Sequence, residues 1–313
     1  YRTGPDSDIV DALVTAARAG KEVTTVIEIR ARFDEEANIQ LADRLQEAGA
    51  HVVYGVVGHK THAKMTLVVR REGERLRNYL HLATGNYHSR TARLYTDYGL
   101  LSADQQLGED VHRIFRQLTS LGQVHSLHKL LQSPFTLHQR MLEAIRAEQA
   151  HAENGEAARI IIKINSLVEP QVIRALYAAS RAGVEVDLIV RGMCCLRPGL
   201  PGVSERIRVR SVVGRFLEHT RVMYFHNRGA PRLWLSSADW MERNFFRRVE
   251  IAFPVEDSQL KEQLIRDLDL YLQDDCQSWL MDADGCYHRS QPLDAAAPLS
   301  SQRTLLERLA EKS

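Results

Sequence analysis

The chain has 313 residues, of which 44% are hydrophobic and 26% are charged, and its formal net charge is +1 at pH 7. This composition is ordinary for a globular protein, and the length is sufficient for about two domains with separate cores. The charge balance excludes a protein that is basic throughout, and the sequence contains neither a run of about 18 apolar residues nor a secretory signal pattern at its start.

Helices and strands are predicted to alternate along the first half of the chain. The hydrophobic spacing predicts helices over residues 6–19, 35–48, 105–120 and 135–151, and strands over residues 23–29, 51–57, 62–69 and 78–83. Gly20 and Gly49 directly follow the first two helices, as is typical of a helix end. Strands that alternate with helices indicate an α/β fold with mixed sheets and helices packed on their faces.

The second half of the chain repeats the first. A short stretch of small and polar residues, 152–158, is interpreted as the link, so the predicted domains are residues 1–151 and 152–313. Residues 172–183 align with residues 9–20 at a constant offset, and both segments end in Arg-Ala-Gly before a predicted strand. This repeat predicts two tandem α/β domains related by internal duplication.

An H-x-K motif at His62 and Lys64 is the first candidate for chemistry. It runs directly into the strand-like sequence of residues 65–69. Side chains two positions apart on a strand point the same way, so His62 and Lys64 are expected to project together. An imidazole beside a fixed cation suits attack on a phosphate. The motif alone is short and common by chance.

The second half contains counterparts of this motif and of the turn that follows it. His219 and Arg221 stand where the first half has its histidine and lysine, and residues 237–239 take the place of residues 84–86. A pseudo-two-fold axis would bring the two histidines to one central site. One histidine would then attack phosphorus while the other supports the leaving side, and the two cations would hold the equatorial oxygens.

An acid follows eleven residues after each of the two turns, at Asp97 and at Glu250. These matched acids add to the case for duplication. The alternative for His219 is that it is a buried structural histidine, paired with Glu218 or Asp239. The repeat favours the functional interpretation.

Charge is unevenly distributed in the second half. Residues 191–248 contain twelve arginines, no lysine and four acids, whereas residues 256–284 contain nine acids and two bases. The arginines could line a cleft for a polyanion, because the guanidinium group matches phosphate geometry with paired donors. They could equally belong to a solvated surface with uneven charge.

The four cysteines show no C-x-x-C pair and no metal-finger spacing. They are Cys194, Cys195, Cys276 and Cys286. Reduced cysteines in a cytosolic protein are the better interpretation.

The repeated H-x-K, with its downstream G-x-N and acid, resembles the phospholipase D superfamily. Residues 31–38, 91–98, 190–194 and 235–241 are similar to a more specific group, the catalytic half of polyphosphate kinases that are phosphorylated on histidine (family 1). In that family this carboxy-terminal region consists of two phospholipase D-like domains. The resemblance runs from Tyr1 to about Asp275, and the family's amino-terminal and head domains are absent, which indicates a fragment of a longer protein.

The resemblance implies reversible transfer of the terminal phosphate of ATP to inorganic polyphosphate, with Mg²⁺ as the cofactor. It implies that His62 is the phosphorylated nucleophile. It also implies that Tyr95, Arg191 and His219 contact ATP. Arg221 departs from strict H-x-K, since arginine keeps the charge but changes the geometry. We therefore expect that only the His62 half carries the covalent phosphate.

The resemblance further places Arg2 and Arg32 in a phosphate–Mg²⁺ site. A guanidinium group is a poor ligand for a cation, so both arginines are interpreted as phosphate clamps near the metal. The family has one nucleotide contact in the missing amino-terminal domain. The isolated fragment is therefore expected to bind ATP weakly or to be inactive.

Two other functions remain open from the sequence. One is a phosphodiesterase of phospholipase D type, and the other is a non-catalytic fragment that binds polyanions. For the kinase, the expected partners are ATP, ADP and inorganic polyphosphate, with no nucleic acid. The full-length enzyme is expected to be a homo-oligomer and to be cytoplasmic, either free or peripheral to the inner face of the membrane.

Overall fold

The computed structural model describes the chain apart from residues 5–6, 32–33, 57, 121–125, 293–296 and 312–313. The elements that precede residue 154 are α1 (Asp8–Arg18), β1 (Thr24–Ile27), α2 (Glu35–Glu47), β2 (His51–Tyr54), β3 (Lys60–Thr61), β4 (Met65–Glu72), β5 (Arg75–Ala83), α3 (Ser89–Leu94), β6 (Tyr95–Thr96), β7 (Gly99–Ser102), α4 (Gln105–Ser120), β8 (Leu131–Ser133) and α5 (Leu137–Glu153). The elements that follow are β9 (Arg159–Ile164), α6 (Pro170–Ala182), β10 (Glu185–Val190), β11 (Ile207–Val212), β12 (Leu217–Glu218), β13 (Val222–Phe225), η1 (Asn227–Gly229), β14 (Arg232–Ser236), α7 (Glu242–Phe246), β15 (Arg248–Pro254), α8 (Ser258–Gln273), β16 (Ser278–Met281), β17 (Tyr287–Arg289) and α9 (Ser301–Ala310).

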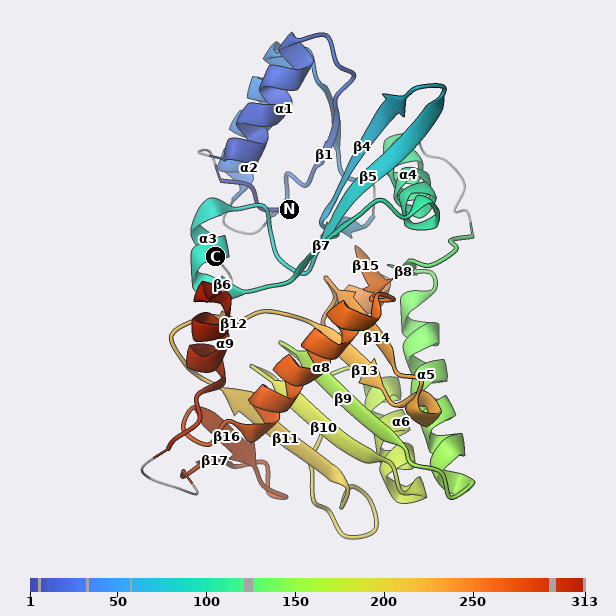
Figure 1. Cartoon of the computed structure of the whole chain (residues 1–313), viewed down its shortest axis with the longest axis vertical. Helices are drawn as coiled ribbons and strands as arrows, with labels where there is room; N and C mark the ends of the chain where they lie inside the picture. The colour runs from blue at the N-terminus through green and yellow to red at the C-terminus, as the bar shows by residue number, and fades with distance from the viewer. Residues whose placement is uncertain (5–6, 32–33, 57, 121–125, 293–296, 312–313) are drawn as a thin grey trace.

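The second half is built on a mixed sheet. Within the described residues this sheet has ten strands, in the order β17-β16-β11-β10-β9-β13-β14-β15-β3, with β8 paired to β15. Strands β9, β10 and β11 are parallel, whereas β13, β14 and β15 continue the sheet in antiparallel pairs. Helices α5 and α6 cover one face and α8 crosses the other (Figure 1).

Both faces of this sheet are buried, which explains why its central strands are apolar at almost every position. In β9, Ile160, Ile162 and Ile164 belong to the core shared with α5 and α6. Ile161 points to the opposite face, into the core shared with α8. The alternation follows from the two-residue period of a strand.

The first half contains two smaller sheets. Strands β1 and β2 are parallel, and α1 and α2 pack on them through a separate core that includes Val10, Val14 and Leu45. Strands β4, β5 and β7 form an antiparallel sheet, with α4 beside it (Figure 1). Helices α1 and α6, the two copies of the repeated segment, are followed by Gly20 at φ 77° and Gly183 at φ 109°. This left-handed backbone favours glycine.

Two short strand pairs join the halves. Strand β3 of the first half is parallel to β15, and β6 is parallel to β12 of the second half. In the first pair Thr61 is opposite Val249, and in the second Thr96 is opposite Glu218. In each pair, the residue that follows one of the two strands is a histidine, and the residue next to the paired position in the other segment is an acid.

The predicted α/β fold with mixed sheets in two repeated domains is confirmed. One local prediction is wrong, because His62 does not lie on a strand: β3 ends at Thr61 and β4 begins at Met65. The backbone N–H groups of His62 and Ala63 both donate to the carbonyl oxygen of Val249, each at 2.9 Å, which interrupts the strand.

The domain boundary after residue 151 stays a prediction. Strand β8 and helix α5 precede it almost entirely, yet β8 pairs with β15 and α5 packs against α6.

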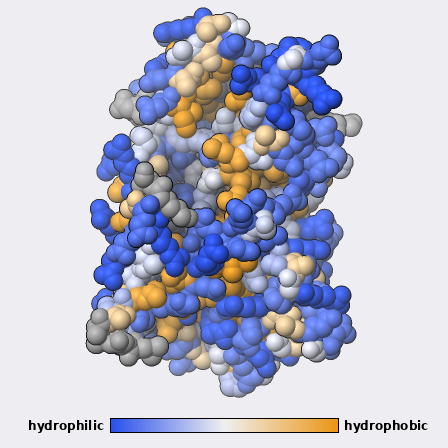
Figure 2. Space-filling view, in the orientation of Figure 1, coloured by the Kyte–Doolittle hydropathy of each residue, from blue (hydrophilic) through white to orange (hydrophobic). Residues whose placement is uncertain are grey.

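The face of the molecule in Figure 2 is mainly hydrophilic, with hydrophobic residues gathered around hollows in its upper and middle parts. No described helix is long and apolar enough to cross a membrane.

Candidate active site

His62 reaches from the first half of the chain to an acid of the second half. Its Nδ1 atom lies 2.8 Å from Oε2 of Glu250, and both side chains are buried. Glu250 lies on β15, the same strand that binds the backbone of His62. The strand pairing therefore fixes both members of this histidine–acid pair.

His219 makes the reciprocal contact. It directly follows β12, and its Nδ1 atom lies 2.9 and 3.0 Å from the two carboxylate oxygens of Asp97, which directly follows β6. His219 belongs to the second half and Asp97 to the first. The two histidine–acid pairs thus cross between the halves, which is the arrangement that a pseudo-two-fold axis would produce.

A hydroxyl group supports each acid. The hydroxyl of Ser237 donates to Oε2 of Glu250 at 2.6 Å, and the hydroxyl of Thr84 donates to Oδ1 of Asp97 at 2.7 Å. Ser237 and Thr84 are the first residues of the two turns that match in the sequence repeat. Their positions explain why an acid follows each turn at the same distance.

The surroundings keep both histidines neutral. Burial lowers the pKa of His62 well below its usual value, and Lys64 adds to this effect. Burial lowers the pKa of His219 to about 4, assisted by Arg221 and opposed by the hydrogen bond to Asp97. A neutral imidazole that donates from Nδ1 to a carboxylate has its lone pair on Nε2. Each Nε2 atom is therefore the potential nucleophile.

The two cations lie beside the two histidines. Nζ of Lys64 donates to the backbone oxygen of His62 at 2.5 Å, and Nη1 of Arg221 donates to the backbone oxygen of His219 at 2.8 Å. Burial lowers the pKa of Lys64 to about 7, with Glu250 acting in the opposite direction. Each cation also lowers the pKa of the histidine of the other half: Arg221 acts on His62 and Lys64 on His219.

The surroundings of the two rings differ. Nη1 of Arg221 lies 3.2 Å from Nε2 and 3.4 Å from Nδ1 of His219, so the guanidinium group lies against that ring. The same guanidinium group is held by Asp239 through two contacts of 3.2 Å. Among the described residues, none donates a hydrogen bond to Nε2 of His62. Its ring packs edge-on against Tyr1, with centroids 4.6 Å apart.

Tyr95 and Arg191 lie on the His219 side of the site. The ring of Tyr95 is 5.1 Å from that of His219, and Nη1 of Arg191 donates to the backbone oxygen of Glu218 at 2.7 Å. Arg191 directly follows β10, where the carboxyl end of a parallel strand often faces a binding crevice. The structure thus brings together Tyr95, Arg191 and His219.

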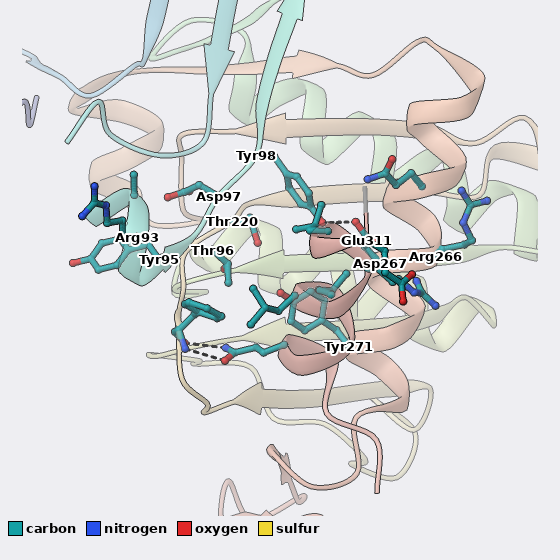
Figure 3. Close-up of a pocket in the computed structure, with 18 residues that line it drawn as sticks. Arg93, Tyr95, Thr96, Asp97, Tyr98, Thr220, Arg266, Asp267, Tyr271 and Glu311 are labelled. Atoms are coloured by element: carbon teal, nitrogen blue, oxygen red, sulfur yellow. Dashed lines mark hydrogen bonds between the residues drawn. The ribbon is translucent and has the colours of Figure 1, made fainter. Parts of the chain in front are cut away.

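A pocket of about 690 Å³ opens beside this part of the site (Figure 3). Tyr95 and Thr96 of β6 and the following residue, Asp97, line one side of it. Tyr98, Asp267 and Tyr271 lie together on another side, and the hydroxyl of Tyr98 donates to Asp267 at 2.8 Å. Leucines of α9 complete an apolar wall.

Arg2 lies on the His62 side. It forms an ion pair with Asp34, and its guanidinium carbon is 5.9 Å from the centroid of Tyr1. Arg32, the other predicted phosphate clamp, lies outside the described residues. Among the residues that the structure describes, no group of three or more His, Cys, Asp or Glu side chains could hold a metal ion.

The sequence did not reveal how the acids are used. The sequence marks Asp97 and Glu250 as matched acids, but only the strand register shows that each contacts the histidine of the other half. The alternative partners for His219 are excluded, since Glu218 binds Lys163 and Asp239 binds Arg221.

Arg248 was also missed. Nη1 of Arg248 lies 3.9 Å from Oε1 of Glu250, and its guanidinium carbon is 5.8 Å from the centroid of Tyr1. Its position two residues before the matched acid Glu250 was the available signal.

The arginine-rich segment divides between two roles. Arg191, Arg221 and Arg248 surround the histidines, as described above. Others pair with acids elsewhere on the molecule: Arg197 with Asp284, Arg206 with Glu185, Arg208 with Glu185 and Asp187, and Arg228 with Glu156. The surface interpretation therefore holds for much of this segment.

Acid should destabilise the fold through His219. Its pKa of about 4 is below the usual 6.5, so between these values the unfolded chain binds the proton first, and stability falls as the pH falls. At pH 5 we expect the free energy of unfolding to be about 2 kcal/mol lower than at pH 7, since one pKa unit corresponds to about 1.4 kcal/mol. Urea denaturation at each pH measures this free energy. In the His219→Gln variant, the difference in unfolding free energy between pH 7 and pH 5 should be smaller by about this amount. An unchanged difference in that variant would contradict the low pKa assigned to His219.

Two family models match the chain. One, described as "Polyphosphate kinase C-terminal domain 1", matches residues 1–124, and "Polyphosphate kinase C-terminal domain 2" matches residues 130–302. A curated polyphosphate kinase of Pseudomonas aeruginosa is 60% identical over 310 residues, covering 99% of this chain and 45% of the relative. That of Xylella fastidiosa (strain Temecula1) is 59% identical, covering 99% and 44%. The chain thus spans about half the length of the curated relatives it matches.

Solved structures give a similar result. The crystal structure of polyphosphate kinase from Porphyromonas gingivalis has a TM-score of 0.91 and 36% identity, covering 100% of this chain and 48% of that chain. A phosphatidylserine synthase from Haemophilus influenzae has a TM-score of 0.54 at 10% identity, covering 98% of this chain and 92% of that chain. The second likeness shows a shared fold alone.

Proposed function

Because the chain belongs to the polyphosphate kinase family, we propose that it is a catalytic region that transfers the terminal phosphate of ATP reversibly to inorganic polyphosphate. The transfer passes through a phosphohistidine on His62. The observation that carries this proposal is the buried contact between Nδ1 of His62 and Glu250, which leaves the lone pair on Nε2.

In the first step, Nε2 of His62 attacks the γ-phosphorus of ATP. The new N–P bond forms as the bond from phosphorus to the β,γ-bridging oxygen breaks, and its electron pair leaves with ADP. The imidazole ring gains positive charge, and the ionised carboxylate of Glu250 stabilises this charge because it already accepts the hydrogen bond from Nδ1–H. In the second step, a terminal oxygen of polyphosphate attacks phosphorus, and the N–P electron pair returns to Nε2. No proton is lost or gained at His62.

The cations of the site hold the phosphate groups during both steps. Lys64 and Arg221 neutralise the oxygens of the transferred group, in keeping with the large electrostatic share of phosphoryl-transfer catalysis. Arg2 and Arg32 act as clamps on the same phosphates. Arg191 binds phosphate on the opposite side. Tyr95 stacks on the base of ATP.

The difference between the two rings supports His62 as the nucleophile. Arg221 lies within 3.2 Å of Nε2 of His219 and competes for its lone pair. Lys64 donates to the backbone oxygen of His62, as Arg221 does to that of His219, but among the described residues none donates to Nε2 of His62. His219 assists from the opposite side, where binding of the phosphate dianion would favour its protonated form beside Asp97.

Mg²⁺ is proposed to enter with ATP as the counter-ion of its phosphates. The described residues do not form a metal cage, and Asp34 is a carboxylate already paired with Arg2. Mg²⁺ commonly relies on substrate phosphates and water for most of its ligands. The mechanism above therefore uses only the side chains of this chain.

A cytoplasmic location, free or at the inner face of the membrane, is proposed with the same function. All four cysteines are free, as expected in a reducing compartment. Assembly of the full-length enzyme into a homo-oligomer stays a prediction.

The test is incubation with ATP labelled on the γ-phosphate. We expect a protein phosphate that is labile in acid and stable in base, and labelled polyphosphate as product. ATP labelled on the α-phosphate is the control and should leave the protein unlabelled. Cleavage of a chromogenic phosphodiester without labelling would favour the phospholipase D-type enzyme. Retention on immobilised polyphosphate without either activity would favour a binding module.

A further inference from the structure

Glu218 precedes His219 but points away from the active site, into a buried polar cluster. Its Oε2 atom lies 2.6 Å from Nζ of Lys163, which is 2% exposed, and accepts a hydrogen bond of 2.9 Å from the hydroxyl of Thr96. Lys163 also donates to Thr220 and lies 4.7 Å from the ring centroid of Tyr271. A buried ion pair of this kind adds little net stability, because the cost of desolvating two charges offsets their attraction.

The other oxygen of Glu218 binds helix α9. Nε2 of Gln302 donates to Oε1 of Glu218 at 2.6 Å and to the backbone oxygen of Phe216 at 2.9 Å. Oε1 of Gln302 accepts from the backbone N–H of Phe216 at 2.9 Å. The amide therefore pairs with the chain before β12 as a neighbouring strand would. Both of its N–H donors are used.

Thr96 connects this cluster to the active site through hydrogen bonds. Its hydroxyl donates to Glu218 and accepts the backbone N–H of His219 at 3.1 Å. Thr96 lies between Tyr95 and Asp97, so its contacts set how β6 lies against β12. A shift between these two strands would move His219 relative to Asp97.

The first histidine has a different support. There the backbone N–H of Thr61, before His62, donates to Oε2 of Glu28 at 2.8 Å. Glu28 also accepts the N–H of Arg30, and thus belongs to a local turn of the first half. Only the His219 strand pair, among those described, is tied to the carboxy-terminal helix.

We propose that Gln302 of α9 is a positioning residue, which acts through Glu218 and Thr96 to hold His219 in register with Asp97. The catalytic consequence rests on the proposed function, whereas the structural consequence does not. Since the strands β6 and β12 have two residues each, their own hydrogen bonds are too few to fix the register.

The test replaces Gln302 by methionine, which has a similar unbranched shape without the amide. Gln263→Met is the matched control, because Gln263 is half-buried and lines the same pocket from α8. Labelled histidine allows NMR titration of His219 in the full chain, with the signal assigned by its loss in His219→Gln. Hydrogen exchange at the backbone amide of His219 provides a second measurement.

In Gln302→Met the pKa of His219 should rise by about one unit from its low value, as water reaches the ring. Burial is the largest cause of that low value, and the charged groups that face the ring are Asp97, Arg221 and Lys64. The amide of His219 should exchange faster. Labelling by ATP should slow by about 10- to 100-fold, the usual cost of misplacing a group by about 1 Å.

The control should resemble the parent protein in the titration and in the amide exchange of His219. An unchanged titration and unchanged amide exchange of His219 in Gln302→Met would overturn the proposal, whatever the rate of labelling. Equal changes in Gln263→Met would also overturn it, because they would reflect the pocket wall in general. If the parent protein takes no label from ATP but the pKa of His219 still rises in Gln302→Met, the result would count against the proposed function and support the positioning role.

Discussion

Replacing His62 by alanine abolishes covalent labelling by ATP and polyphosphate synthesis together, if the proposed mechanism is correct, because no nucleophile remains. His219→Ala should keep the nucleophile and lose its support. We expect it to slow labelling by about 10²–10⁴-fold, the range for a positioned acid–base group. The measurement is the rate of labelling in the full-length protein, followed by digestion and location of the phosphopeptide.

The two variants control for each other, because His62 and His219 are buried to the same degree, with 7% and 8% exposed, and each contacts one acid. A general effect of removing a buried imidazole should therefore be similar in both. Any label that His219→Ala accepts should be on the peptide that bears His62. Label on the peptide bearing His219, at a normal rate in His62→Ala, would reverse the assignment.

The repeat is what allowed the sequence to predict the fold. Hydrophobic spacing predicted a helix over residues 105–120, and alignment with the first predicted helix marked residues 172–183 as its repeat; the structure has α4 over Gln105–Ser120 and α6 over Pro170–Ala182. Both helices are long enough for a period of 3.6 residues to be unambiguous. The matched motifs then pointed to two copies of one histidine-bearing unit.

The elements that join the copies were beyond the reach of pattern reading. Strands β3, β6 and β12 have two residues each, too few to show any period. Their pairing depends on contacts between residues far apart in the sequence. The placement of His62 on a strand failed for the same reason, since its backbone is bent by binding to Val249 of the other half.

The function of individual charges also depends on tertiary contacts. Glu218 and Asp239 were reasonable partners for His219 by sequence distance. In the structure each is occupied by a buried cation, Lys163 and Arg221 respectively. A strand directs alternate side chains to opposite faces, so Glu218 cannot serve its neighbour.

Glu250→Gln should slow phosphorylation of His62 strongly, although residue 250 lies in the other half of the chain. Glu250 accepts a hydrogen bond from Nδ1–H of His62, with the heavy atoms 2.8 Å apart, and accepts hydrogen bonds from Ser237 and Asn244 at 2.6 and 2.7 Å. An amide keeps the shape of this side chain but cannot balance the positive charge that develops on the imidazole. We expect a fall of about 10²–10⁴-fold, mainly in kcat, because the lost interaction strengthens only as phosphorus is attacked.

Asp97→Asn provides the contrast, since Asp97 serves His219. That variant should raise KM for ATP more than it lowers kcat, because His219 is proposed to contact the nucleotide. Glu148→Gln is the matched control: Glu148 is 1% exposed and accepts backbone N–H groups of Arg159 and Asn227, at the end of β9 away from the histidines. It should leave both constants unchanged.

Initial rates of polyphosphate synthesis at varied ATP concentration give kcat and KM for the three variants. The assay is made at pH 6, because Glu250 also raises the pKa of Lys64, and the lower pH helps to keep that ammonium group protonated. If Asp97→Asn lowered kcat more than Glu250→Gln did, each acid would serve a different step from the one its histidine contact implies. The crossing of the two pairs would then be a feature of the fold without the division of roles proposed for His62 and His219.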